Sequence, residues 1–414
     1  MSTEKTKKFF SSKLVRNFWI FFGSGLIVSM AYMDPGNWGT NIEGGSTFNY
    51  ALLWAIWLAN GMAMFFQYLS GKIGIAGYSL SEIVKEKIKK KWKILVYWIG
   101  AEMSILATDL AEFLGIVVAL NILFGIPLLI GSFVSVLEIL LFFVVTRKSF
   151  RSIEKAFIWF VSIISLAFVY ELFLAKPEWS QIIFHSVVPT LNASTIFIVV
   201  GIIGATIMPH ALFIHSWLIK NKMKESKDKD KKKSLKFHLA DTVISLTIAG
   251  IVNAAMLIMA ASAFYQRGII ATLSQAYYTL IPLFGEFAAI IFGGALLISG
   301  IASSITGTLA GQSIMEGLTN FRISPLTRRI ITRVVNMIPL TVAILLGLEP
   351  LKVLVYSQVL LSILIPLPLI PIILFTSDKR IMGSLVNKKW TTIFAWIFSA
   401  AIIGLNIYLI TTAF

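Results

Sequence analysis

The sequence contains no cysteine, only four histidines and few charged residues for its 414-residue length. The absence of cysteine excludes disulfide bonds and thiolate metal sites, and it leaves the redox environment of the protein undetermined. Charged side chains make up 14% of the residues and hydrophobic ones 57%, with a mean hydropathy of +0.83. This balance excludes an ordinary water-soluble domain. The sequence therefore predicts an integral membrane protein.

Acidic side chains are also scarce, because 36 lysines and arginines face 20 aspartates and glutamates, a formal net charge of +16. Such a basic chain could bind nucleic acid, but its basic residues occupy short connectors between long apolar stretches. That distribution fits the positive-inside rule better than a nucleic-acid partner. We therefore expect surrounding membrane lipid and no nucleic acid. The sequence does not decide the oligomeric state, and a monomer is compatible with it.

Eleven apolar stretches are long enough to cross a bilayer core of about 30 Å, which takes about 20 helical residues. They cover residues 17–43, 48–71, 95–121, 124–146, 153–175, 194–219, 238–265, 281–312, 328–347, 351–376 and 390–412. All basic residues except Lys176, Arg267 and Lys352 then fall at the amino terminus or in even-numbered loops. This asymmetry predicts a multi-pass cell-membrane protein with a cytoplasmic amino terminus and an extracellular carboxyl terminus.

The first stretch also has features of a signal peptide, with a basic region before it and small residues at Ser29 and Ala31. Cleavage there would remove half of a spanning helix. We therefore interpret residues 17–43 as a membrane span.

Two apolar stretches are interrupted by proline. The segment Asp34–Asn37 reads DPGN, and the segment Met208–His210 reads MPH. Proline removes a backbone donor and disfavours helical geometry in the residue before it, so both helices are expected to unwind there. Inside a membrane, freed backbone groups are tolerated only where they line a cavity or bind a ligand. The two breaks therefore predict a binding site near the middle of the membrane.

The breaks lie near the starts of the first and sixth stretches, which indicates five helices followed by five more. Because five is odd, the second copy must be inverted relative to the first. The sequence thus predicts an all-α membrane protein with a 5+5 inverted repeat in a single domain, residues 1–414. The repeats cover about residues 17–175 and 194–376, and an extra helix covers about 390–412.

The breaks supply a mixed set of possible metal ligands. Asp34 offers a carboxylate oxygen and Asn37 an amide oxygen, Met208 offers a thioether, and unwinding near Ala205 would free its carbonyl. Oxygen ligands alone suit magnesium or calcium, whereas a thioether favours transition metals such as manganese and iron. A membrane methionine ordinarily only packs. The position of Met208 directly before a break, matching that of Asp34, favours a ligand role.

Three segments resemble those of a known family. Residues 31–37 (AYMDPGN), 201–210 (GIIGATIMPH) and 108–113 (TDLAEF) are similar to signature segments of the NRAMP (natural resistance-associated macrophage protein) family. The similarity runs through all eleven stretches. It implies a LeuT-like fold with discontinuous helices 1 and 6. It also implies import of divalent manganese or iron, and also of cadmium, cobalt and zinc, coupled to protons by alternating access.

The resemblance also implies which residues bind the metal. They would be Asp34, Asn37, the Ala205 carbonyl and Met208, with Gln358 in the tenth stretch contributing in one conformation. A magnesium-transporting branch of the family lacks the methionine. We expect no catalytic activity and no cofactor, because manganese or iron would be the transported substrate.

Proton coupling requires titratable groups inside the membrane. Glu102, Asp109 and Glu112 share one helix, and their spacing keeps them within roughly 80° of each other over about 15 Å. This stripe suits a proton relay, with Asp34 as the group that responds to both metal and protons. The alternative for Glu102 is a structural cap or ion pair near a helix end.

Other candidate residues are less distinctive. A lone histidine usually packs, but the family resemblance favours a proton-coupling role for His210, and packing is expected for His215. Arg328 and Arg329 fit the positive-inside pattern, although the resemblance associates them with the proton route. For Glu138 a structural ion pair is expected.

Three other functions deserve weighing. A sodium-coupled amino-acid carrier could share the fold, but it would not require an aspartate at the centre of its site. An intramembrane enzyme is disfavoured because the sequence has no His-Glu-x-x-His motif and no cysteine. A channel would lack the saturation and conformational cycling of a carrier.

Overall fold

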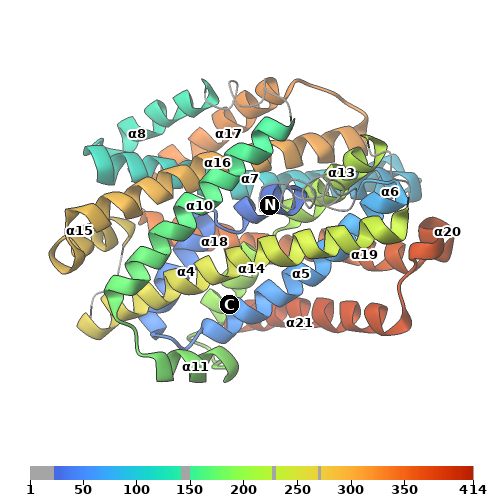
Figure 1. The fold of residues 1–414 in the computed structure, drawn as a ribbon. Coiled ribbons are helices and arrows are strands. Elements are labelled where there is room, and N and C mark those ends of the chain that lie inside the picture. The colour runs from blue at the N-terminus through green and yellow to red at the C-terminus, as the bar shows by residue number, and fades with distance from the viewer. Residues whose placement is uncertain (1–22, 141–149, 226–229, 269–271, 414) are drawn as a thin grey trace, which may run out of the picture.

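The computed structural model describes residues 23–140, 150–225, 230–268 and 272–413. These residues form helices and short 3₁₀ turns, with no β-strand among them, and Figure 1 shows the long helices lying alongside one another. In the first half of the chain the helices are α3 (Ser24–Ala31), α4 (Pro35–Phe48), α5 (Leu53–Ala76), α6 (Leu80–Lys87), α7 (Lys91–Phe124), α8 (Leu128–Val134), η1 (Ser135–Leu137), α10 (Phe150–Ala175) and α11 (Trp179–Val187).

The second half begins with the helices α12 (Ile196–Thr206), α13 (Pro209–Glu225), α14 (Lys231–Ala263), η2 (Tyr265–Arg267), α15 (Leu273–Phe284) and α16 (Glu286–Thr319). They are followed by α17 (Pro325–Leu345), α18 (Pro350–Leu364), α19 (Pro366–Ser377), α20 (Lys379–Met382), η3 (Gly383–Leu385) and α21 (Lys389–Ala413). The prediction of an all-α architecture is confirmed.

Seven helical segments within the described residues are long and apolar enough to cross a membrane. They cover Lys91–Phe124, Lys155–Ala175, Ile196–Lys224, Lys231–Ala263, Glu286–Thr319, Pro350–Ser377 and Lys389–Thr412. Parts of the predicted stretches 17–43 and 124–146 lie outside the described residues. The count of eleven spans therefore stays a prediction.

Both predicted breaks are present. Helix α3 ends at Ala31 and α4 begins at Pro35, while α12 ends at Thr206 and α13 begins at Pro209. Asp34 caps α4, because its carboxylate accepts the backbone N–H of Asn37 at 2.8 Å. A carboxylate at this position also interacts favourably with the positive end of the helix dipole.

One predicted boundary was wrong. The stretch 281–312 was expected to begin inside what is in fact the separate helix α15, which ends where Gly285 adopts a φ of 90°. The stretch 351–376, by contrast, agrees with the apolar segment Pro350–Ser377. Within that segment α18 ends at Leu364 and α19 begins at Pro366, because proline cannot donate the hydrogen bond that would continue the ladder.

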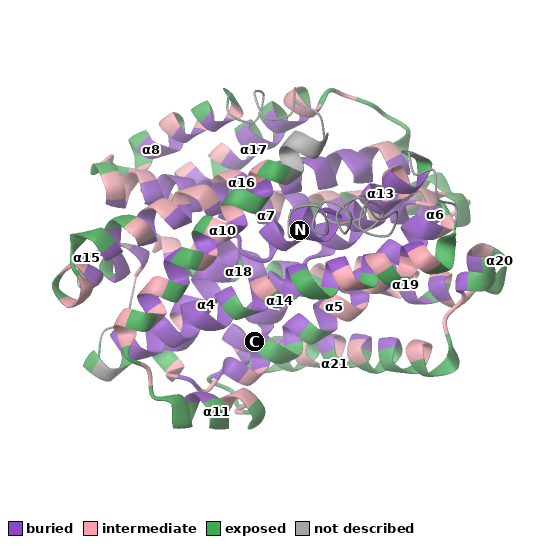
Figure 2. Cartoon of the chain, in the orientation of Figure 1, coloured by how far each residue is buried: buried purple, intermediate pink, exposed green. Residues whose placement is uncertain are grey.

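Buried residues gather in the middle of the molecule, where α4, α5, α14 and α18 lie (Figure 2). Helix α7 packs against α16, α4 against α14, and α12 against α18. Many exposed side chains are large and apolar, such as Trp159 and Phe173 on α10 and Trp390 on α21. An integral membrane protein exposes such side chains to lipid, so these surfaces need no protein partner.

Candidate metal centre and buried charge network

One side chain joins the two breaks. The amide nitrogen of Asn37 on α4 donates to Oδ1 of Asp34 at 2.8 Å and to the carbonyl oxygen of Ala205 on α12 at 2.9 Å. All three residues are buried. The structure thus brings together three of the five predicted metal ligands, from segments far apart in the sequence.

The Asp34 carboxylate is only half satisfied. Its Oδ1 accepts the backbone and side-chain N–H groups of Asn37, whereas its Oδ2 is buried with no hydrogen-bond partner among the described residues. A buried carboxylate oxygen without a partner is costly, because nothing replaces the water it has lost. This oxygen is available to bind a cation or a proton.

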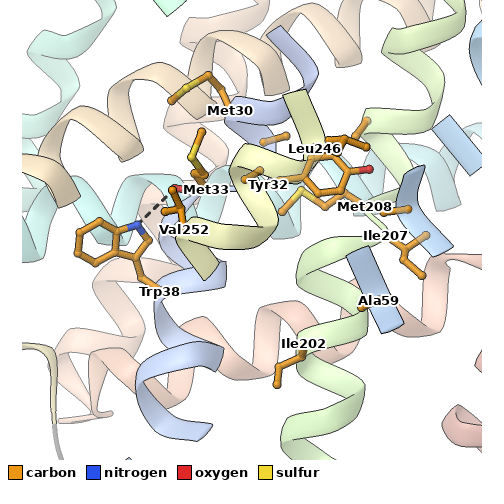
Figure 3. Close-up of a cluster of buried hydrophobic side chains, with 14 of the residues drawn as sticks. Met30, Tyr32, Met33, Trp38, Ala59, Ile202, Ile207, Met208, Leu246 and Val252 are labelled. Carbon is orange, nitrogen blue, oxygen red and sulfur yellow. Dashed lines mark hydrogen bonds between the residues drawn. The ribbon is translucent and has the colours of Figure 1, made fainter. Parts of the chain in front are cut away.

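Met208 lies in the non-helical turn between α12 and α13, three residues after Ala205. Its side chain is fully buried in one apolar cluster with Tyr32 and Met33 of the first break (Figure 3). The thioether therefore lies among residues of both breaks. The ligand role of Met208 stays a prediction.

Gln358 on α18 lies against both broken helices. Its side-chain amide sits so close to Gly36 that a Cβ there would collide with it, and its backbone carbonyl approaches Gly204 of α12 equally closely. Glycine at these positions allows the close approach. The amide nitrogen donates to Ser357 Oγ at 2.9 Å, and the amide oxygen is buried with no partner among the described residues. Gln358 thus presents an available oxygen beside the first break.

The backbone carbonyls freed at the first break are held by neighbouring side chains. Asn253 on α14 donates to the Tyr32 carbonyl at 2.8 Å, and the Met33 carbonyl accepts from Ser299 Oγ on α16 and from Trp38 Nε1 at 3.3 Å (Figure 3). Helices α14 and α16 therefore fix the shape of the break.

Beside the break, α7 carries Glu112 and Thr108. Both Glu112 oxygens are buried without a hydrogen-bond partner in the described part of the chain. One turn further along α7, Gly115 lies directly against Pro35, so this helix abuts the first break. His210 follows the second break, and its Nδ1 lies 3.1 Å from Thr108 Oγ1 while its Nε2 has no partner among the described residues. Titratable groups from α7 and α13 thus flank the breaks.

On the part of α7 that precedes Glu112, two carboxylates form ion pairs with arginines of α17. Arg328 binds both oxygens of Glu102, one at 3.0 Å. Arg329 binds Asp109 Oδ1, and Asn336 donates to Asp109 Oδ2 at 2.7 Å. The predicted proton-route residues of the third and ninth stretches are therefore in direct contact.

Arg333 and Asn336 were not identified from the sequence as functional residues, and Glu138 was expected only to form a structural ion pair. Glu138, directly after η1, accepts from Arg329 Nε at 2.8 Å and from an Arg333 terminal nitrogen at 2.6 Å. Its expected structural ion pair is therefore confirmed. Arg333 follows Arg329 by one helical turn, so the shared face of α17 was a signal that could have identified it.

His215 also has a partner, as expected for a packed histidine. Its Nδ1 lies 2.8 Å from Gln67 Oε1, and the Gln67 amide nitrogen donates to the Tyr32 hydroxyl at 2.8 Å. No group of three or more His, Cys, Asp or Glu side chains in the described ranges has the arrangement of a metal site. A metal ion at the breaks would therefore need ligands of mixed type.

A model of the "Natural resistance-associated macrophage protein-like" family matches residues 25–412. The chain belongs to this family. It is 42% identical to a divalent metal cation transporter, MntH, of Clostridium acetobutylicum over 399 residues, which cover 95% of this chain and 91% of that protein. It is 40% identical to MntH of Bacillus subtilis over 397 residues, which cover 95% of this chain and 92% of that protein.

Among solved structures, this NRAMP chain is similar to a manganese transporter of Eremococcus coleocola, with a TM-score of 0.88 and 30% identity. The match covers 97% of this chain and 88% of that one. MhsT in complex with L-phenylalanine matches with a TM-score of 0.60 and 14% identity, covering 95% of this chain and 98% of that one. Mhp1 matches with a TM-score of 0.56 and 13% identity, covering 95% of this chain and 90% of that one. These last two share the fold alone, and they bear out the LeuT-like architecture.

Proposed function

We propose that this chain is a secondary active transporter that imports divalent transition-metal ions and couples their passage to proton movement by alternating access. Manganese and iron are the main substrates, and cadmium, cobalt and zinc share the pathway. The observation that carries the proposal is Asp34 Oδ2, which has no hydrogen-bond partner in the described structure and lies on the carboxylate bound by the Asn37 amide that joins both helix breaks. The names of the relatives in Clostridium and Eremococcus, which refer to divalent metal and manganese transport, support it.

The hydrogen bonds of Asn37 suggest how the metal binds. Its amide nitrogen now lies between two acceptors, Asp34 Oδ1 and the Ala205 carbonyl. A cation that enters replaces this N–H group as the partner of both oxygens, and the amide turns to offer its own oxygen. Met208 adds a sulfur ligand that disfavours calcium and magnesium. Gln358 contributes its free amide oxygen in one conformation.

Protons pass through the groups of α7. Asp34 and Glu112 each have buried oxygens without a hydrogen-bond partner among the described residues, so each can accept a proton. Metal binding and proton binding compete at Asp34, because a protonated carboxylate holds a cation less well. The proton continues through Asp109 toward the ion pairs of Arg329 and of Glu102 with Arg328, and His210 assists at the break.

The direction of transport follows from the membrane potential. With a cytoplasmic amino terminus and an extracellular carboxyl terminus, the cell membrane's inside-negative potential draws cations inward. A potential of about 100 mV contributes about 2.3 kcal/mol per charge, and therefore about 4.6 kcal/mol for a divalent ion. The metal is substrate rather than a resident cofactor, and one chain contains the whole site.

A sodium-coupled amino-acid carrier is the alternative that the fold likeness to MhsT raises. Such a carrier binds the substrate carboxylate at the positive end of a broken helix. Here the start of α4 already holds the Asp34 carboxylate, and a second carboxylate beside it would be repelled. This arrangement disfavours an amino-acid substrate.

Reconstitution of the full chain in liposomes tests the proposal. We expect saturable manganese uptake with acidification of the lumen under an inside-negative potential. Sodium-driven uptake of radiolabelled amino acids, without manganese uptake, would support the alternative instead.

A further inference from the structure

We propose that Glu138 is a positioning residue of the proton route: it balances the charge of Arg329 whenever Asp109 accepts a proton. The inference rests on the proposed function, because it assumes that Asp109 is neutralised during transport. Glu138 lies directly after η1, whereas Asp109 is on α7 and both arginines are on α17. Its role is therefore visible only in the folded molecule.

The four residues form one buried cluster with Arg329 at its centre. Arg329 binds Asp109 on one side and Glu138 on the other, with a terminal nitrogen 2.6 Å from Glu138 Oε1. Arg333 is 2.6 Å from the same Glu138 oxygen and 4.0 Å from Asp109 Oδ1. The side chains of all four are at most 4% exposed. Two carboxylates and two guanidinium groups leave the cluster formally neutral.

The surroundings add hydrogen bonds but no further charge in contact with Glu138. Ser304 on α16 donates to Glu138 Oε2 at 3.0 Å, and the guanidinium group of Arg333 stacks on the Phe113 ring at 4.1 Å. Glu112 on α7 is another carboxylate close enough to interact electrostatically with Asp109 and Arg329. Among the described residues of the packed elements α7, α16 and α17, the charged contacts of Glu138 are therefore the two arginines.

A buried guanidinium group becomes very costly when its partner is lost. If Asp109 were the sole partner of Arg329, protonation of Asp109 would leave that charge uncompensated. Glu138 keeps Arg329 paired, so the cluster carries one positive charge in that state rather than two. By lowering this cost, Glu138 allows Asp109 to accept a proton from the metal-site side and release it.

The charge count predicts opposite effects of two substitutions. Glu138→Gln leaves the resting cluster with one extra positive charge, which opposes protonation of Asp109. Arg333→Gln leaves it with one extra negative charge, which favours protonation. The double variant Glu138→Gln with Arg333→Gln is neutral again, like the wild type. A buried charge a few ångströms from Asp109 interacts strongly with its carboxylate. Each single change should therefore shift the pH of half-maximal acidification by about one unit or more.

The test uses the full chain in liposomes, with manganese uptake and luminal acidification measured together over a range of external pH. We expect the pH of half-maximal acidification to fall in Glu138→Gln, to rise in Arg333→Gln, and to return to the wild-type value in the double variant. Manganese uptake should change less than acidification. Glu171→Gln, which removes a buried carboxylate on α10 that has no arginine contact among the described residues, is the matched control and should behave as wild type.

Shifts in the same direction in both single variants, or no recovery in the double variant, would overturn the charge-balancing role. Wild-type behaviour of Glu138→Gln would also overturn it. If Glu138→Gln does not fold, the charge-balancing role is tested by the other two variants. The pH of half-maximal acidification must then rise in Arg333→Gln and return to the wild-type value in the double variant. A wild-type chain that takes up no manganese would instead refute the proposed function.

Discussion

At the scale of single residues, the proposed metal and proton binding depends on a few buried polar atoms that have no hydrogen-bond partner among the described residues. Asp34 Oδ2, both oxygens of Glu112 and the Gln358 amide oxygen are buried without hydrogen bonds in the described structure. Natural proteins satisfy nearly all buried polar groups, so exceptions ask for an explanation. All three residues lie at or beside the same two helix breaks. A cation and a proton are partners that would satisfy such oxygens.

Replacing Asp34 with alanine should abolish manganese uptake. Even the loss of a group that merely supports a metal ligand costs about 10–100-fold in affinity, so loss of this carboxylate should cost at least about 100-fold. Uptake of radioactive manganese into liposomes measures the effect. Asp378→Asn, at the surface near α20, serves as control, and uptake near the wild-type rate in the Asp34 variant would refute the site.

Replacing Met208 with alanine should relax selectivity more than it reduces transport. Without the thioether, the remaining oxygen ligands suit calcium and magnesium, so both ions should begin to compete with manganese. We expect manganese uptake to remain measurable. Competition assays on this variant, with Met62→Ala as a buried-methionine control on α5, give the comparison. Continued exclusion of calcium would show that the sulfur does not discriminate.

At the scale of elements, the sequence predicted best what is local. The breaks follow directly from Pro35 and Pro209, because proline acts on its own helix and on the residue before it. The stripe on α7 follows from helical periodicity. The boundary at Gly285 was missed because it depends on a positive φ that the apolar pattern does not reveal.

The charge network could not be predicted in full. It requires η1 and α17 to approach α7, and its members Asp109, Glu138 and Arg333 are far apart in the sequence. Arg333 also fits the positive-inside pattern, so its sequence position indicated a cytoplasmic loop end rather than a buried ion pair. Contacts of this kind depend on tertiary packing, which periodicity does not specify.

The titratable side chains of α7 should affect proton movement more than metal movement. Replacing Glu112 with glutamine keeps the shape of the side chain and removes its ability to hold a transferable proton. We expect metal-stimulated acidification to fall several-fold more than manganese flux, as followed with pH-sensitive and metal-sensitive dyes in the same liposomes. Equal losses of both fluxes would point to a damaged structure, and the thermal stability of the purified variant would show this.

At the scale of the whole molecule, the chain is an integral membrane protein of the NRAMP family whose buried polar groups lie inside a shell of exposed apolar side chains. Its two broken helices meet although their breaks are far apart in the sequence. This meeting is what the inverted-repeat prediction required. The orientation of the chain in the membrane rests on the distribution of basic residues and is open to a direct test.

The absence of cysteine makes that test simple. In intact cells, a membrane-impermeant thiol reagent should label Ala193→Cys, in the exposed loop before α12, and should leave Lys388→Cys, before α21, unlabelled. Permeabilised cells should show labelling of both variants. The reverse pattern in intact cells would invert the proposed topology.

The central claim is that both helix breaks jointly bind one metal ion through oxygen and sulfur. X-ray absorption spectroscopy of the purified full chain with bound cadmium, a soft ion that reports sulfur ligands clearly, tests this most directly. We expect one sulfur neighbour among oxygen neighbours in the wild type, and loss of that sulfur in Met208→Ala. A wild-type spectrum with oxygen neighbours alone, or a sulfur signal that survives the substitution, would contradict it.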